Sequence, residues 1–217
     1  MSLHMRILNL LKQSYIAKQA KRPSGWIGTW IISPVLIKGN DRLNDFMLEV
    51  VPPGASDIIL EVGFGPGEAI YKLAKTARRA KIYGVDFSAD MVRKAKKRNA
   101  VFVGSGRVAL TLGDISTLPY KSNTMDKIYT ANTIYFWPDP EADAKELYRV
   151  LKPKGVLVIG FRTRAQMENL PITQTEFMLY SPEEAHSLLS GAGFKTISIE
   201  TRPEEGVFDS FCAIAVK

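Results

Sequence analysis

Short apolar runs and longer amphipathic runs alternate along this chain, and this alternation constrains the fold more than any other feature. The apolar runs are expected to be strands and lie at residues 57–62, 81–86, 108–114, 126–132, 155–161, 194–200 and 208–216. The stretches with apolar residues at helical spacing lie at residues 68–79, 88–98, 139–153 and 181–193. Repeated alternation of strand and helix predicts a mostly parallel sheet with helices on both faces.

Capping residues mark the starts of several of these helices. Ser88 precedes one helix, and Asp139 followed by Pro140 places a cap before a proline in the first helical position. Ser181 and Glu184 have the spacing of a capping box. These positions predict where the chain turns from one layer to the next.

The expected fold class is α/β, a Rossmann-like three-layer sandwich around a seven-stranded sheet. The segment RPEEG between the last two predicted strands has room only for a hairpin, so the last strand should run antiparallel. In such sheets ligands bind outside the carboxyl ends of the strands, near the point where the strand order reverses. Functional residues are therefore expected at strand ends.

Composition indicates one soluble domain. The chain has 217 residues, of which 46% are apolar and 24% charged. One cysteine, Cys212, excludes an intrachain disulfide and a cysteine-based zinc site, and its scarcity fits a cytoplasmic protein. No apolar run approaches the ~20 residues that span a bilayer. The net charge of +7 leaves open an attraction to nucleic acid, anionic lipid or an acidic substrate.

The stretch LEVGFGPG at residues 60–67 places a glycine-rich turn after the first predicted strand. In a dinucleotide fingerprint the third small residue would fall at Glu68 or Ile70, and neither fits. No Gly-Lys-Ser/Thr follows, so the phosphate-binding loop of nucleotide triphosphatases is excluded as well.

Three carboxylates end three neighbouring predicted strands. Glu61 precedes the glycines, Asp86 ends the second strand and Asp114 ends the third. Together they would repel a phosphate. They suit a ligand that carries a cation, ribose hydroxyls and an amino group.

With these motifs the chain resembles the class I S-adenosylmethionine (SAM)-dependent methyltransferases. It is most similar to the branch that includes quinone-biosynthesis and phospholipid N-methyltransferases. The resemblance covers residues 55–161, in the stretches LEVGFGPG, YGVDFS, GDISTLPY, DKIYTANTIYFW and ELYRVLKPKGVLVIG. It implies SAM as cofactor and S-adenosylhomocysteine as product.

The resemblance also implies a role for each matching residue. Glu61 would orient the turn and the methionine amino group of SAM. Asp86 would accept hydrogen bonds from both ribose hydroxyls, and Asp114 from the adenine amino group. The other implied cofactor contacts are Gly63, Phe64, Gly65 and Gly67 in the turn, Phe87 and Ile115 on the two faces of the adenine, and Asn132 near the methionine end.

Methyl transfer chiefly requires that the acceptor be held in line with the methyl group. A general base is needed only where the acceptor arrives protonated or is a carbon acid. Tyr135 is the candidate for such a base, or for a wall of the acceptor site. The candidate acceptor contacts are Trp26, Trp30, Tyr135, Phe136, Trp137, Phe161, Arg162 and Phe177.

Three methyltransferase subclasses are disfavoured. The fourth predicted strand is not followed by an Asp/Asn-Pro-Pro-Tyr/Phe segment, which argues against methylation of nucleobase amino groups or of glutamine amides. Cys212 lacks a preceding proline, which argues against methylation of cytosine C5. No acidic triad of the catechol type is evident, so no metal is expected.

Residues 1–50 are expected to form an N-terminal helical cap before a SAM-binding domain at residues 51–217. Apolar residues repeat at helical spacing near the start, among basic residues, and two tryptophans follow. The segment is read as a lid over the substrate. The alternatives are a basic amphipathic segment on an anionic membrane and ordinary packing against the core.

The expected function is methyl transfer to a small, apolar acceptor such as a lipid-like or quinone-like molecule, with no obligate protein partner. Two alternatives stay open. The positive charge suggests an RNA methyltransferase, although nucleic acid is the less favoured partner. A non-catalytic SAM-binding or membrane-surface module would keep the same fold.

Overall fold

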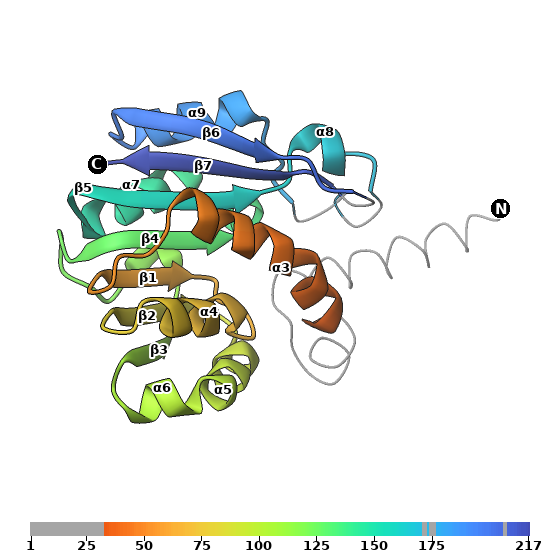
Figure 1. The fold of residues 1–217 in the computed structure, drawn as a ribbon. Coiled ribbons are helices and arrows are strands. Elements are labelled where there is room, and N and C mark those ends of the chain that lie inside the picture. Colours follow the sequence, from red (N-terminus) through yellow and green to blue (C-terminus); the bar gives the residue numbers. More distant parts are fainter. Residues whose placement is uncertain (1–32, 171–172, 174–176, 206–207) are drawn as a thin grey trace.

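The computed structural model describes residues 33–170, 173, 177–205 and 208–217. Seven strands form one sheet in the order β3-β2-β1-β4-β5-β7-β6 (Figure 1). These strands are β1 (Ile58–Val62), β2 (Lys81–Asp86), β3 (Val108–Leu112), β4 (Met125–Ala131), β5 (Leu151–Phe161), β6 (Thr196–Arg202) and β7 (Ser210–Val216).

Strands β1 to β5 are mutually parallel where they pair, and β7 runs antiparallel to both of its neighbours, β5 and β6. The predicted seven-stranded sheet with an antiparallel last strand is confirmed. The central strands are apolar almost throughout, as expected for strands buried on both faces; four of the five residues of β1 are buried.

Helices cover the two faces of the sheet. One face carries α3 (Ser33–Val50), α4 (Glu68–Thr76) and α5 (Ala89–Arg98), and the other carries α7 (Pro140–Val150) and α9 (Pro182–Gly191) (Figure 1). The shorter elements are α6 (Ala100–Gly104), α8 (Arg164–Met167) and the 3-10 helices η2 (Ile115–Thr117) and η3 (Ile134–Phe136). In the described part of the chain, no helix combines the length and the apolar character of a membrane span.

The predicted helix caps are present. The Ser88 hydroxyl caps α5, and the Asp139 carboxylate accepts from the Ala142 N–H at 3.1 Å to cap α7. At the start of α9, Ser181 and Glu184 form both bonds of the capping box.

Strand β5 is longer than its sequence pattern predicts. It begins at Leu151 rather than residue 155 and includes Pro153, which has no N–H to donate to a neighbouring strand. The pairing of β4 with β5 shifts register between Met125 and Lys127. Because the proline lies beside this irregularity, the strand tolerates it.

Helix α3 is an integral part of the sandwich. Leu43, Phe46 and Met47 are buried and join the apolar cluster beneath α4 and α5. A Cβ built at Gly160 of β5 would overlap Met47, so the glycine allows α3 to approach the sheet closely. Residues 33–50, which the sequence assigned to a cap, thus supply a core helix, and the proposed lid at residues 1–32 lies outside the described residues.

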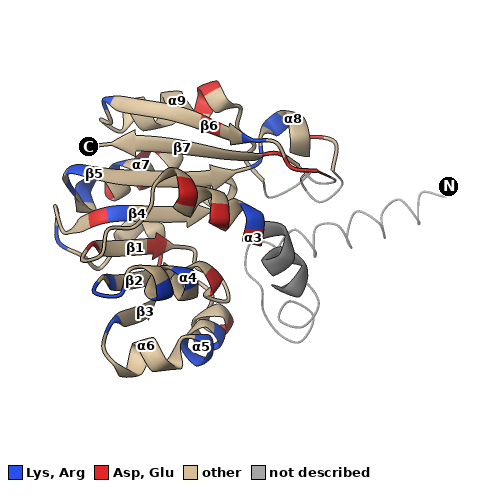
Figure 2. Cartoon of the chain, in the orientation of Figure 1, with Lys and Arg blue, Asp and Glu red and all other residues tan. Residues whose placement is uncertain are grey.

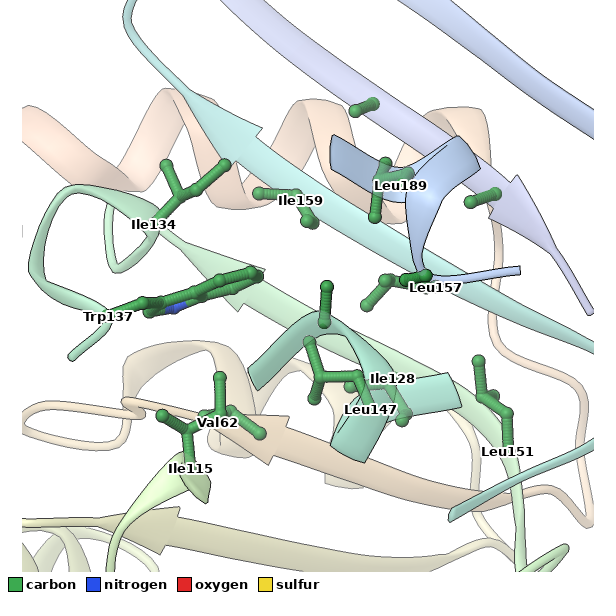
Figure 3. Packing of buried hydrophobic residues seen from close by; sticks show 14 of the residues in the cluster. Val62, Ile115, Ile128, Ile134, Trp137, Leu147, Leu151, Leu157, Ile159 and Leu189 are labelled. Carbon is green, nitrogen blue, oxygen red and sulfur yellow. The ribbon is translucent and has the colours of Figure 1, made fainter. Parts of the chain in front are cut away.

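The second apolar cluster fills the opposite face (Figure 3). Ile128 and Leu157 of the sheet meet Leu147 of α7 and Leu189 of α9, and all four side chains are fully buried. This cluster extends to Trp137 and Ile134 at the carboxyl end of β4. The core therefore continues directly beneath the edge where the sequence places the site.

The strand order reverses between β1 and β4. Strands β2 and β3 lie on one side of β1, whereas β4 and β5 continue on the other. The carboxyl ends of β1, β2 and β4 meet at the same edge because the strands are parallel. A ligand site is expected at this switch point.

Candidate functional site

The turn after β1 is built from glycines in the left-handed region. Gly63 and Gly67 have φ values of 69° and 82°. The Gly63 N–H donates to the Val85 carbonyl at 2.8 Å, and the Gly67 N–H donates to the Phe64 carbonyl at 3.0 Å. Helix α4 begins directly after the turn, so its amino end faces the same edge.

Two of the glycines also lack room for a side chain. A Cβ at Gly63 would overlap the Thr133 methyl group, which follows β4, and a Cβ at Gly67 would lie 2.7 Å from the Ala95 Cβ of α5. Gly65 differs, because a Cβ there would meet nothing within 4 Å. Gly63 and Gly67 therefore serve packing within the protein, and Gly65 is the glycine that borders open space.

Asp86 ties the turn to the end of β2. Its carboxylate accepts from the Gly65 N–H at 2.8 Å and from the Ser88 N–H at 2.9 Å. The side chain is buried, and burial raises the pKa of Asp86 to about 6, a rise that these two hydrogen bonds oppose.

Glu61 is the second buried carboxylate of the site. Its Oε2 atom is buried without a hydrogen-bond partner. Burial, followed by the nearby charge of Asp86, raises the pKa of Glu61 to about 8, against a smaller opposing effect from the Ile70 N–H. A buried carboxylate oxygen without a donor is costly, and a cationic ligand group would relieve that cost.

Asp114 and Ile115 follow β3. The Asp114 carboxylate accepts from the Ser116 N–H at 3.0 Å and caps η2, and its residue is exposed. Ile115 is buried, and Phe87, beyond β2, is half-buried. Strand β3 ends at Leu112, two residues earlier than predicted, so Asp114 follows the strand instead of ending it and is exposed to solvent.

Asn132 adopts a positive φ of 55° directly after β4. Its N–H donates to the Gly160 carbonyl at 2.8 Å, and its Oδ1 lies 3.2 Å from the Tyr135 hydroxyl. The same hydroxyl accepts from the Arg162 N–H and lies 3.0 Å from the Arg162 carbonyl. Tyr135 thus joins the loop after β4 to the end of β5.

The surroundings of Tyr135 do not favour a role as a base. The side chain is 1% exposed, and burial raises the pKa of its hydroxyl above the ordinary range. A phenol in this state keeps its proton at neutral pH, and its hydroxyl is already engaged by the backbone of Arg162.

Phe136 and Phe177 form an aromatic pair beside Tyr135. Their ring centroids are 4.6 Å apart in an edge-to-face arrangement, and the Phe177 ring lies 5.8 Å from the Tyr135 ring. The neighbouring Met178 N–H donates to the Tyr135 carbonyl at 3.0 Å. Phe136 and Phe177 are half-buried, so the loops after β4 and β5 present an aromatic surface at this edge.

Three other predicted acceptor contacts are buried within the protein. Phe161 and Trp137 are buried in the core, and the Trp137 Nε1 donates to the Thr133 hydroxyl at 3.2 Å. The Arg162 guanidinium, also buried, donates to the Asp209 carbonyl at 2.8 Å and to the Ser210 hydroxyl at 2.7 Å. Trp26 and Trp30 lie outside the described residues.

Sequence reasoning missed Thr133 and Asn99. Thr133 packs against Gly63 and bonds to the hydroxyl of Thr130, and the Asn99 Nδ2 donates to the Gly67 carbonyl at 3.0 Å. Both brace the turn from a neighbouring element. No motif in the sequence marks them, because their role depends on contacts across the fold.

The arrangement fits SAM in three respects. Glu61 offers an unpartnered carboxylate oxygen that suits an ammonium group, and Asp86 offers a buried carboxylate at the end of β2. Gly65 leaves open space above the turn. No group of three or more histidine, cysteine, aspartate or glutamate residues within the described ranges has the geometry of a metal site.

Known proteins share both the sequence and the fold. The family model described as "Methyltransferase domain" matches residues 60–159. The protein named "Uncharacterized methyltransferase YdaC" from Bacillus subtilis is 30% identical over 193 residues, which cover 84% of this chain and 96% of that protein. The "Ubiquinone/menaquinone biosynthesis C-methyltransferase UbiE" of Geotalea daltonii is 32% identical over 135 residues, and the match covers 61% of this chain and 57% of that protein.

A solved structure agrees with the fold. The SAM-dependent methyltransferase of Aquifex aeolicus superposes with a TM-score of 0.68 at 24% identity, over 84% of this chain and 93% of that chain. The expected class, cofactor and reaction type are confirmed by these similarities together. With its glycine turn, its strand-end carboxylates and its reversed strand order, the chain belongs to the class I SAM-dependent methyltransferases.

Proposed function

We propose that this enzyme methylates a small apolar acceptor, held between the loop after β4 and the connection after β5. The observation that carries the proposal is the aromatic surface of Phe136 and Phe177. Tyr135 links this surface to Asn132, because its ring packs near the Phe177 ring and its hydroxyl bonds to the Asn132 side chain. An apolar ring or chain packed there would be adjacent to the cofactor's methionine end.

On the cofactor side, Asp86 would accept hydrogen bonds from the ribose and Glu61 would pair with the amino group. Each Asp86 oxygen already accepts one backbone N–H, which fixes the carboxylate's orientation and leaves a second lone pair on each oxygen. Phe64, in the turn, is buried against Gly84 of β2 and supports the turn from below. Asp114, Phe87 and Ile115 would surround the adenine.

SAM supplies a methyl group on a sulfonium, so the protein's contribution is mainly to orient the acceptor and exclude water. The Tyr135 hydroxyl and the Arg162 backbone fix the two loops that carry Phe136 and Phe177. In this proposal Tyr135 is a positioning residue and Arg162 holds the start of β7 in place. Because Tyr135 is not a base in this proposal, the acceptor is expected to bind with its nucleophilic atom already free of its proton.

A quinol-like ring is the first acceptor class to test. The surface is aromatic, and the relative from Geotalea daltonii is named for ubiquinone and menaquinone biosynthesis. Lipid head-group amines form the second class, in keeping with the branch that the sequence resembles.

The test has two steps. Calorimetric titration should first show binding of SAM and of S-adenosylhomocysteine. Transfer of labelled methyl from SAM should then be measured with quinols and with lipid amines. F136A and F177A should raise KM for the acceptor about tenfold or more while leaving SAM affinity unchanged.

Y148A is the matched control, because Tyr148 of α7 is a half-buried aromatic residue that packs edge-to-face on Phe194, with ring centroids 5.1 Å apart. Equal activity of F136A, F177A and Y148A would reject the proposed acceptor surface. SAM binding without transfer to any acceptor would favour a non-catalytic module.

A further inference from the structure

The positive charge of the chain is concentrated in one region. Residues 68–107 contain eleven lysine and arginine residues and three acidic residues, a net charge of +8. The whole chain has a net charge of +7, so all other residues together sum to −1. One of the three acidic residues, Asp86, is buried in the cofactor site. The basic residues lie on α4 and α5 and around α6 (Figure 2).

Helix α6 presents apolar side chains in the middle of this charge. Its sequence is AVFVG, and no side chain in it is buried. Val101 is 81% exposed, the highest value among the exposed large apolar residues of the described chain. Phe102 and Val103 are half-buried and pack against the core, so packing accounts for them, but it does not account for Val101.

The basic residues next to α6 differ in their pairing. Arg93 pairs with Asp90 at 2.8 Å, and Arg98 pairs with Glu68. Lys96 and Lys97 are exposed, and within the described ranges neither has an ion pair. Their charges are therefore available to an external anionic partner.

Helix α4 extends the same surface. The Tyr71 ring packs against the Phe102 ring with centroids 5.8 Å apart, and the Lys75 ammonium lies 5.3 Å from the centre of the Tyr71 ring. We call these six residues the α5–α6 surface: Lys75 and Tyr71 of α4, Lys96 and Lys97 of α5, and Val101 and Phe102 of α6.

We propose that the α5–α6 surface docks this enzyme on an anionic lipid bilayer, with Val101 entering the interface and the half-buried Phe102 supporting it from the protein side. Amphipathic surfaces of this kind combine apolar side chains that enter the acyl boundary with lysines that reach the lipid phosphates. Nucleic acid is the poorer match, because the exposed valine at the centre of the surface can neither donate a hydrogen bond to a phosphate nor pair with its charge. The proposal concerns where the enzyme resides and is independent of the acceptor.

Vesicle co-sedimentation of the full chain tests the proposal. Wild-type protein should bind vesicles in which about half of the lipid is phosphatidylglycerol, and should not bind pure phosphatidylcholine vesicles. Binding should weaken as salt rises toward about 0.5 M. K96E/K97E should lower the partition coefficient about tenfold or more, and V101D should lower it several-fold.

The matched control is K145E/K195E, which makes the same charge change at two exposed lysines, on α7 and after α9. It should retain most of the binding. Thermal unfolding and SAM titration of every variant verify that each is folded.

Four results would overturn the proposal. The first is a failure of wild-type protein to bind anionic vesicles at low salt. The second is binding of V101D and K96E/K97E that equals wild-type binding. Equal loss in K145E/K195E would attribute binding to overall charge. Retention on single-stranded RNA, abolished by K96E/K97E and without vesicle binding, would assign the surface to nucleic acid.

Discussion

Glu61 and Asp86 place two buried carboxylates at the ends of the neighbouring strands β1 and β2. Each has a raised pKa, and in each case burial is the main cause. The Oε2 atom of Glu61 has no donor, whereas both oxygens of Asp86 accept backbone hydrogen bonds. The two residues therefore respond differently to substitution.

We predict that E61Q stabilises the ligand-free protein at alkaline pH. The folded-state pKa of Glu61 is raised from 4.5 to about 8, so the folded protein keeps a proton that the unfolded chain releases. Stability from this group is complete below about pH 4.5 and is lost as pH rises to about 8. At about pH 8 the free energy of unfolding of E61Q should exceed that of wild type by on the order of 2 kcal/mol.

Urea unfolding at about pH 5 and about pH 8 measures the effect. Asp86 also makes the free energy of unfolding depend on pH, mainly between pH 3.8 and about pH 6, and it does so in both wild type and variant. An identical pH slope in both proteins from about pH 6 to 8 would show that Glu61 is not the group responsible.

Replacement of Asp86 should act on binding. D86A removes the acceptor for the Gly65 and Ser88 N–H groups and the proposed ribose contact. SAM affinity should fall about a hundredfold or more, since a charge-assisted hydrogen bond contributes about 1.5–3 kcal/mol. Near wild-type affinity in calorimetry would reject this assignment of Asp86.

At the scale of elements, the glycine turn is held by the helices and strands around it. Thr133 after β4 contacts it at Gly63, and Asn99 after α5 contacts it at Gly67. Its shape is therefore a property of three parts of the chain that are distant in sequence.

The turn makes a paired prediction about glycine. G63A should be strongly destabilising, because its left-handed φ and the overlap with Thr133 add to each other. G65A has only the conformational cost of about 1–2 kcal/mol, since nothing lies within 4 Å. G65A should thus fold but bind SAM weakly. Denaturant unfolding and SAM titration separate the two effects, and equal losses of stability would contradict this account.

The capping box of α9 gives a prediction about stability alone. The Ser181 hydroxyl accepts from the Glu184 N–H at 3.2 Å. S181A should lower the free energy of unfolding by about 1 kcal/mol and leave SAM affinity unchanged. A loss of SAM affinity would mean that α9 and the site are coupled.

Elements with strong local signals could be predicted from the sequence. The bounds of β2 match the prediction at both ends, and the caps Ser88, Asp139 and Ser181 are where their residue types indicate. The short helices α6 and α8 and the early start of β5 were missed. A helix of four or five residues has no measurable periodicity, and the extension of β5 depends on its pairing with β4.

The site was predictable only in part, for a related reason. Glu61 and Asp86 could be placed at strand ends, because the apolar pattern of the sequence shows where those strands end. The sequence does not show whether Phe161 and Trp137 face the core or a ligand, because that depends on how the chain turns at the end of β5 and after η3. Both are buried in the structure, whereas Phe136, next to Trp137 in the chain, is half-buried.

At the scale of the whole molecule, ligand binding should raise stability. A ligand at about 100 times its Kd adds about 2.7 kcal/mol to the free energy of unfolding. For a domain of this size the melting temperature should rise about 5–10 °C with S-adenosylhomocysteine. D86A should show little or no shift, and a full shift in that variant would place the ligand elsewhere.

Strand β7 lies between β5 and β6, although it follows both in the chain. Within the described sheet, β6 pairs only with β7. During synthesis β6 and α9 therefore leave the ribosome before the strand that will hold β6 in the sheet. Each of β2 to β5 can pair with a strand made before it, but this edge can close only after β7 has been made.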